Sequence, residues 1–193
     1  MLECLEGMHR QGYLHRDVKP ANFVRRRKGG RDFVVIDFGL AKQYRAPGGE
    51  LRPERPKAEF RGTSMYASLG AHEELDQSRR DDLWSLLYVF LDLYLGKLPW
   101  AELVRARDKP AVASMKRRYF NGDASYTENL NVNIHTSVAF KMLKEVKWAD
   151  EPDYKLLRGV FQDIHEGLSQ EEKDEEEAFL WDTPPPPPGP PPP

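Results

Sequence analysis

The residues best suited to chemistry lie near the start of the chain, in the stretch 15–22, which reads HRDVKPAN, and at Asp37. A carboxylate such as Asp17 can accept the hydrogen bond or proton of an attacking hydroxyl, and the ammonium of Lys19 can stand beside a transferring phosphate. Asn22 and Asp37 offer the hard oxygen ligands that Mg²⁺ prefers. These residue types together predict a site for metal-assisted phosphoryl transfer.

A β-hairpin is expected to bring the two oxygen ligands together. Residues 23–26 and 33–36 are short aromatic and β-branched runs, and the sequence RKGGR between them is a turn signal. Pairing of these runs places Asn22 and Asp37 side by side, and Gly39 lets the backbone turn tightly after the second ligand. The basic tip of the hairpin could bind an anion, although a solvated tip is the simpler interpretation.

The remaining chain predicts a mainly helical domain. Residues 1–10 have the spacing of an amphipathic helix that ends at Gly12, and residues 81–95 are apolar on all sides, which is typical of a buried helix stopped by Gly96. Further helices are expected around 110–119, 138–146 and 154–164. The segment 40–61 shows no periodicity and is interpreted as a long loop.

Composition excludes several classes of protein. The chain has 193 residues and a net charge of −2, which gives no reason to expect nucleic acid as a partner. The single cysteine, Cys4, excludes an internal disulfide and is interpreted as a buried helix residue in a reducing compartment. No secretory signal is recognisable, and the apolar run 83–95 is too short to span a bilayer. We therefore expect an intracellular protein, cytoplasmic or nuclear or both, with no membrane partner.

The end of the chain differs in composition from the rest. We expect a folded domain over 1–168 and a tail over 169–193 that is first acidic and then proline-rich, disordered beyond about residue 183. Proline runs adopt extended polyproline II and can bind SH3, WW or profilin-type domains. A plain solvated tail is the simpler alternative.

Longer matches make chance an insufficient explanation for the two motifs. Small-molecule phosphotransferases of kinase-like fold also place an Asn five residues after an Asp, but Lys19 favours protein Ser/Thr kinases. The stretches GTSMYAS (62–68), QSRRDDLWSL (77–86), LPW (98–100) and PDY (152–154) resemble the casein kinase I superfamily, which includes the tau-tubulin kinases. The resemblance covers about residues 1–182 and implies a protein-kinase-like C-terminal lobe, with the N-terminal β lobe absent.

The resemblance also implies roles for single residues. Asp17 would be the catalytic base, Lys19 the lysine beside the phosphate, and Asn22 and Asp37 the Mg²⁺ ligands for bound ATP. In the same family Thr63 would sit beside Asp17 and mark specificity for Ser and Thr in protein substrates.

Other features of the family concern the framework around the site. Asp82 would hold the backbone of the catalytic loop. Two departures from the family pattern are Ser68-Leu69-Gly70 in place of a Ser-Ile-Asn-like stretch, and Met65 in place of an arginine that helps bind anions.

Half of the expected machinery is missing from the sequence. It contains no G-x-G-x-x-G loop and no third-strand lysine in a V-A-I-K-like context. We therefore expect an N-terminally truncated kinase fragment that is inactive alone, since positioning of ATP supplies much of the catalysis. The alternative is a non-catalytic, kinase-derived binding module that offers its proline run to partners.

Overall fold

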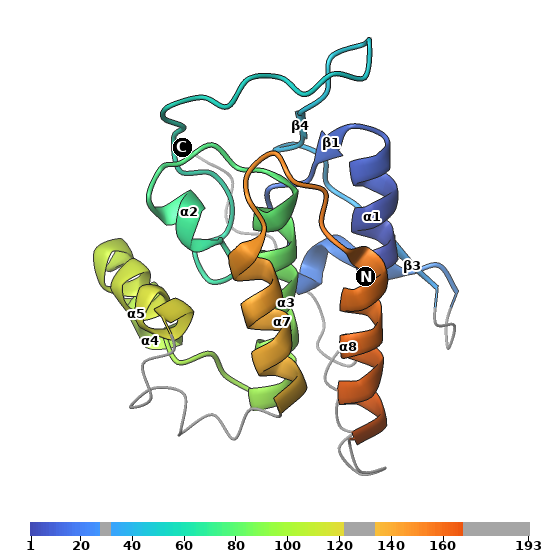
Figure 1. Cartoon of the computed structure of the whole chain (residues 1–193). Helices are drawn as coiled ribbons and strands as arrows, with labels where there is room; N and C mark the ends of the chain where they lie inside the picture. Colours follow the sequence, from blue (N-terminus) through green and yellow to red (C-terminus); the bar gives the residue numbers. More distant parts are fainter. Residues whose placement is uncertain (28–31, 122–133, 168–193) are drawn as a thin grey trace.

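The helix α3 (Arg79–Leu95) lies at the centre of the fold, seen in a computed structural model that describes residues 1–27, 32–121 and 134–167 (Figure 1). At its start the carboxylate of Asp81 accepts a hydrogen bond from Ser78 N at 2.8 Å. At its end Gly96 adopts the left-handed conformation, with φ of 69°. Its side chains are buried on every side over most of its length. The predictions of a buried helix and of its stop at Gly96 are confirmed.

The other elements surround this helix in chain order. They are α1 (Leu2–Arg10), β1 (Tyr13–Leu14), the 3₁₀ helix η1 (Pro20–Asn22), β2 (Phe23–Arg25), β3 (Phe33–Val35), β4 (Lys42–Gln43), α2 (Leu69–His72), α4 (Ala101–Arg105), α5 (Lys109–Asn121), α7 (Ile134–Glu145) and α8 (Tyr154–Gly167). The described residues are therefore mostly helical with small sheets, as the sequence predicts. The short helices α2 and α4 were not predicted, because one or two turns are too few to show a periodicity.

The helices α1, α7 and α8 pack around α3 and build the core with it. Ring contacts connect them: Trp84 on α3 meets Phe140 on α7 with centroids 5.5 Å apart, and Phe90 meets Phe161 on α8 at 5.5 Å. The helices α4 and α5 contact each other, and in Figure 1 they lie on the side of α3 opposite to α1. The core thus holds the ends of α1 and α3 in fixed positions, and the site is built on those ends.

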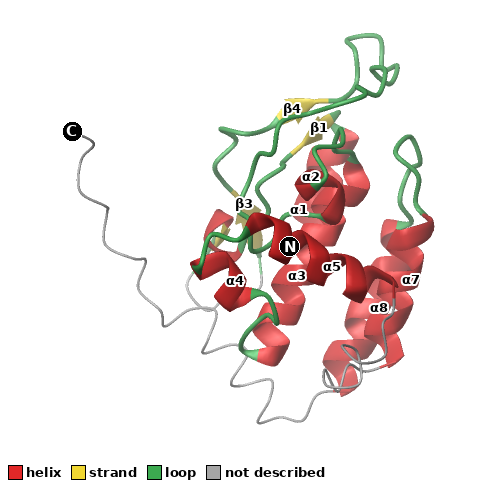
Figure 2. Ribbon diagram, turned by 90° about the vertical axis from the view of Figure 1, so that its left-hand side faces the viewer, coloured by secondary structure: helices red, strands yellow, loops and turns green. Residues whose placement is uncertain are grey.

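Two antiparallel two-stranded sheets lie at the edge of the helical core (Figure 2). The pairing of β2 with β3 sets Phe23 opposite Val35 and confirms the predicted hairpin. The pairing of β1 with β4, with Tyr13 opposite Gln43, was not predicted. It forms within the segment interpreted as loop, which otherwise has no regular structure apart from one bridge between Arg45 and Leu51. Strands of two residues are too short to leave a signal in the sequence.

Three sequence expectations need a comment. Cys4 lies on α1 as predicted but is half-buried rather than buried, and its Sγ donates to Phe33 O at 3.3 Å. The proline run and the acidic stretch lie outside the described residues, so the tail and the domain boundary stay predictions. Among the described residues no helix combines the length and the apolar character needed to cross a membrane.

Candidate active site

The loop 15–22 follows β1, and the buried carboxylate of Asp82 at the start of α3 holds its backbone. Asp82 Oδ2 accepts from His15 N at 2.7 Å, and Oδ1 accepts from Arg16 N at 2.8 Å. Arg16 has a φ of 65°, an uncommon conformation for a residue with a side chain, so the two bonds stabilise a strained turn. This confirms the position that the family resemblance implied for Asp82.

His9 completes the environment of this carboxylate. His9 Nε2 donates to Asp82 Oδ2 at 2.8 Å, and His9 Nδ1 lies 2.7 Å from the hydroxyl of Tyr154 on α8. Burial opposes the ionisation of Asp82, but the hydrogen bonds from His9 and from the two backbone amides outweigh it and lower the pKa of Asp82. The helices α1, α3 and α8 therefore meet at one ionised group that positions the loop.

Asp17 lies at the middle of the candidate site with hydrogen-bond donors on both oxygens. Thr63 Oγ1 donates to Oδ1 at 2.7 Å, and Lys19 Nζ donates to Oδ2 at 2.6 Å. Asn22 Nδ2 donates to the backbone oxygen of Asp17 at 2.9 Å. Partial burial would raise the pKa of Asp17, but the hydrogen bonds from Lys19 and Thr63 lower it overall. The group is therefore a carboxylate at neutral pH, and its orientation is fixed.

The approach of Thr63 to Asp17 depends on Gly62. Gly62 has a φ of 103°, and a Cβ built on it would lie 2.6 Å from the backbone oxygen of Arg16. Any other residue would meet this oxygen and would also be strained at that φ. A glycine immediately before Thr63 is therefore what lets the two loops touch.

The hairpin brings Asp37 next to the same loop. Because Phe23 pairs with Val35, the residues that flank the pair are neighbours, and Ile36 N donates to Asn22 O at 2.9 Å. Asp37 follows with a φ of 61° and accepts a hydrogen bond from Gly39 N at 3.2 Å. Its carboxylate is exposed. Asn22 and Asp37 thus lie at adjacent ends of paired strands, as the hairpin prediction requires.

The comparison with known proteins decides the family. The family described as protein kinase domain matches residues 1–162. The chain belongs to the protein kinase family. A Dictyostelium discoideum protein named as a probable serine/threonine-protein kinase is 38% identical over 174 residues, which cover 89% of this chain and 34% of that protein. A Caenorhabditis elegans protein that also has serine/threonine-protein kinase in its name is 36% identical over 177 residues, covering 83% of this chain and 46% of that protein.

The two relatives are longer than this chain. It spans about a third of the first and less than half of the second. The relationship therefore establishes a protein kinase with serine/threonine kinase relatives, while the activity of the complete protein is a matter for proposal.

The donors at Asn22 and Asp37 fit the Mg²⁺ that protein kinases generally use with ATP. The amide nitrogen of Asn22 is committed to Asp17 O, which leaves its oxygen for a cation. The Asp37 carboxylate is exposed and close in the hairpin. One amide oxygen and one carboxylate suit Mg²⁺, which keeps several waters and takes further oxygens from substrate phosphates.

The kinase domain also contains positioning residues that the sequence interpretation missed. Lys116 is fully buried and donates to Ser64 O at 2.9 Å and to Ala67 O at 2.6 Å. Trp100 Nε1 donates to Met65 O at 2.8 Å. These bonds fix the loop that follows Thr63. The available signal was a lysine placed four residues after Val112 on the apolar face of its helix, where a charge needs a partner.

Lys116 has a distinctive environment. Its ammonium lies 4.8 Å from the ring centre of Tyr88 and 5.1 Å from that of Trp100, so two aromatic faces supply cation–π contacts. Burial lowers the pKa of Lys116 well below its ordinary value. Burial, followed by the charge of Lys116, also lowers the pKa of the neighbouring His72 to about 4. His72 is therefore neutral, and its Nε2 lies 3.2 Å from Ser64 O.

Proposed function

We propose that the chain carries the catalytic-loop half of a protein serine/threonine kinase of casein kinase I type, which transfers phosphate from Mg-ATP to Ser or Thr of protein substrates. The observation that carries the proposal is the Asp17 carboxylate, held between the hydroxyl of Thr63 at 2.7 Å and the ammonium of Lys19 at 2.6 Å. An oriented carboxylate next to a cation suits a reaction that depends mainly on positioning and charge stabilisation.

In this proposal Asp17 orients the substrate hydroxyl. Its lowered pKa keeps it ionised, so it accepts the hydroxyl hydrogen bond and takes the proton only as the bond to phosphorus forms. Lys19 Nζ lies beside Asp17 Oδ2 and would turn toward the transferred phosphoryl group. Thr63 fixes the other oxygen and leaves room for a small aliphatic hydroxyl.

The metal and nucleotide would be held by the neighbouring hairpin. Asn22 and Asp37 are the residues proposed to hold Mg²⁺, and Lys19, Asn22 and Asp37 to contact the nucleotide phosphates. The bound ion would supply neutralisation of phosphate charge. This chain's own contribution is the pairing of β2 with β3, which fixes how far apart the two oxygen ligands lie.

We further propose that residues 1–193 form the C-terminal lobe and transfer phosphate poorly by themselves. The sequence lacks a glycine-rich loop and a third-strand lysine, and these groups orient the α- and β-phosphates in protein kinases. The family assignment to casein kinase I rests on the stretches 62–68 and 77–86. An intracellular location and binding of SH3, WW or profilin-type domains by the proline run are also proposals.

Two measurements on the 193-residue chain test the site. The first is binding of Mn²⁺-ADP, followed by paramagnetic broadening of NMR signals. We expect broadening to centre on Asn22 and Asp37 and to be lost in Asp37→Asn, whereas Asp32→Asn, a matched change on the exposed start of the same hairpin strand, retains it. Broadening that is equal in both variants would contradict the metal assignment.

The second measurement is transfer of labelled phosphate from ATP to casein. We expect a rate near background for the chain alone. After addition of a nucleotide-binding lobe from a casein kinase I relative, transfer should appear and should fall by about 10²-fold or more in Asp17→Asn. Transfer that persists in Asp17→Asn would refute the role of this carboxylate.

A further inference from the structure

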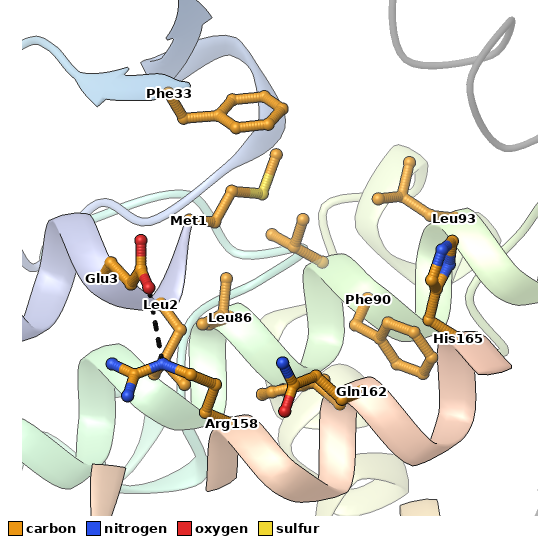
Figure 3. A pocket seen from close by; sticks show the side chains of 12 residues that line it. Met1, Leu2, Glu3, Phe33, Leu86, Phe90, Leu93, Arg158, Gln162 and His165 are labelled. Atoms are coloured by element: carbon orange, nitrogen blue, oxygen red, sulfur yellow. Dashed lines mark ion pairs between the residues drawn. The ribbon is translucent and has the colours of Figure 1, made fainter. Parts of the chain in front are cut away.

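An apolar pocket of about 500 Å³ opens between α1, α3 and α8, away from the residues discussed above (Figure 3). Its walls include Met1, Leu2, Phe33, Val89, Leu93 and Phe161. Several of these side chains are only partly buried and pack directly against the core. The pocket is therefore an extension of the core that is open to solvent in the described fold, and an apolar surface of this kind marks a binding site.

The polar residues at the pocket lie toward α8. Arg158, Gln162 and His165 line it from that helix, and Arg158 Nε is 3.5 Å from the carboxylate of Glu3 (Figure 3). Glu3 is 79% exposed, so this contact is weak and exchangeable. The pocket thus combines an apolar floor with a rim that carries amide, imidazole and guanidinium donors.

We propose that this pocket binds the chain's own segment Phe179–Trp181, in cis. These residues and Ala178 are the only apolar side chains, prolines aside, between residues 169 and 193. An acidic run precedes them and a proline run follows, and both stay solvated. Two aromatic side chains and a leucine are thus available to fill an apolar pocket of this size.

Chain geometry makes the contact accessible. His165, which lines the pocket, lies two residues before the end of α8 at Gly167. The linker of eleven residues up to Phe179 can reach at most about 40 Å when extended, which exceeds the distance across the end of one helix. A short linker also gives a high effective concentration, so a modest contact suffices for occupancy.

Charge favours docking from the α8 side. Asp182 follows Trp181 directly, and a docked segment would bring its carboxylate toward Arg158, which is only partly buried. The acidic run would then extend past His165 and away from Glu3. Docking would cover the exposed apolar floor and would fix the point from which the proline run begins.

Hydrogen exchange on the full 193-residue chain tests the proposal. The variant F179S/L180S/W181S removes the apolar side chains without touching the pocket. We expect amides in the first turns of α1 and in residues 158–166 to exchange about tenfold faster than in the wild type, because their cover is lost. A matched variant with three changes in the proline run, P186S/P187S/P188S, should exchange like the wild type.

Trp181 fluorescence gives a second readout. The difference between the wild type and Trp181→Phe should be a blue-shifted emission that becomes red-shifted when the pocket is changed by Leu93→Asp. Unchanged exchange in F179S/L180S/W181S together with a solvated Trp181 emission would overturn the proposal. Protection that rises with protein concentration would also overturn it, because it would assign the pocket to a second copy of the chain.

Discussion

The buried carboxylate of Asp82 is the most informative residue to perturb. In Asp82→Ala the N–H groups of His15 and Arg16 and the Nε2–H of His9 all lose their acceptor, in bonds of 2.7 to 2.8 Å. A buried donor left unsatisfied costs about 1–3 kcal/mol. Arg16 is half-buried and can recover a water, so we expect a total loss of about 3–5 kcal/mol, which is typical of breaking a buried charged network.

The assay is urea unfolding followed by far-UV circular dichroism at pH 7. With a slope of about 2 kcal/mol per M, this loss lowers the midpoint by about 2 M. Asp82→Asn keeps one acceptor oxygen and should lie between Asp82→Ala and the wild type. Asp32→Ala, on the exposed hairpin, is the control and should shift the midpoint very little.

The same group sets a dependence on pH. Because the pKa of Asp82 is lower in the folded state than in the unfolded chain, its contribution is present above the unfolded value, about 3.9, and is lost as pH falls through the folded value. The stability difference between the wild type and Asp82→Asn should therefore be largest near neutral pH and should shrink in acid. If Asp82→Ala and Asp32→Ala have equal midpoints at pH 7, the reasoning about this network is wrong.

Three further changes test other parts of the fold. Gly62→Ala should destabilise by about 1–3 kcal/mol in urea unfolding, because its Cβ would meet the backbone oxygen of Arg16 at 2.6 Å in a strained conformation. Gly7→Ala, within α1 and with nothing near its Cβ, should instead stabilise by about 0.5–1 kcal/mol in the same assay; a loss of stability would contradict this. Lys116→Met should change global stability by less than about 1 kcal/mol, since loss of the ammonium bonds is offset by relief of its desolvation. It should nevertheless speed hydrogen exchange of residues 64–67, and unchanged exchange there would show that Lys116 does not position this loop.

Much of the candidate site could be predicted because its signals are local. The order and spacing of Asp17, Lys19, Asn22 and Asp37 identify a phosphate chemistry, and the turn residues between two β-branched runs predict the hairpin that brings the ligands together. The buried helix from residue 81 was equally clear, because seventeen residues of α3 repeat one pattern many times over.

Contacts between distant segments could not be predicted in the same way. His9 and Lys116 lie 73 and 49 residues away from partners that they hold, at Asp82 and Ala67. Nothing in a local window shows which donor will face which acceptor, since that depends on how helices pack. The pairing of β1 with β4 was missed for the same reason, as two residues per strand carry no pattern of their own.

The sequence by itself determined the chemistry of this protein: the residue types at 15–22 and 37–39 indicate a kinase-like phosphate site. The tertiary structure decided which atoms meet. It places Thr63 against Asp17 through the open space at Gly62, and it holds the catalytic loop on a carboxylate that stays ionised within the core. The reason is physical, because a motif specifies functional groups, whereas their distances and pKa values follow from packing, burial and hydrogen bonds across the whole fold.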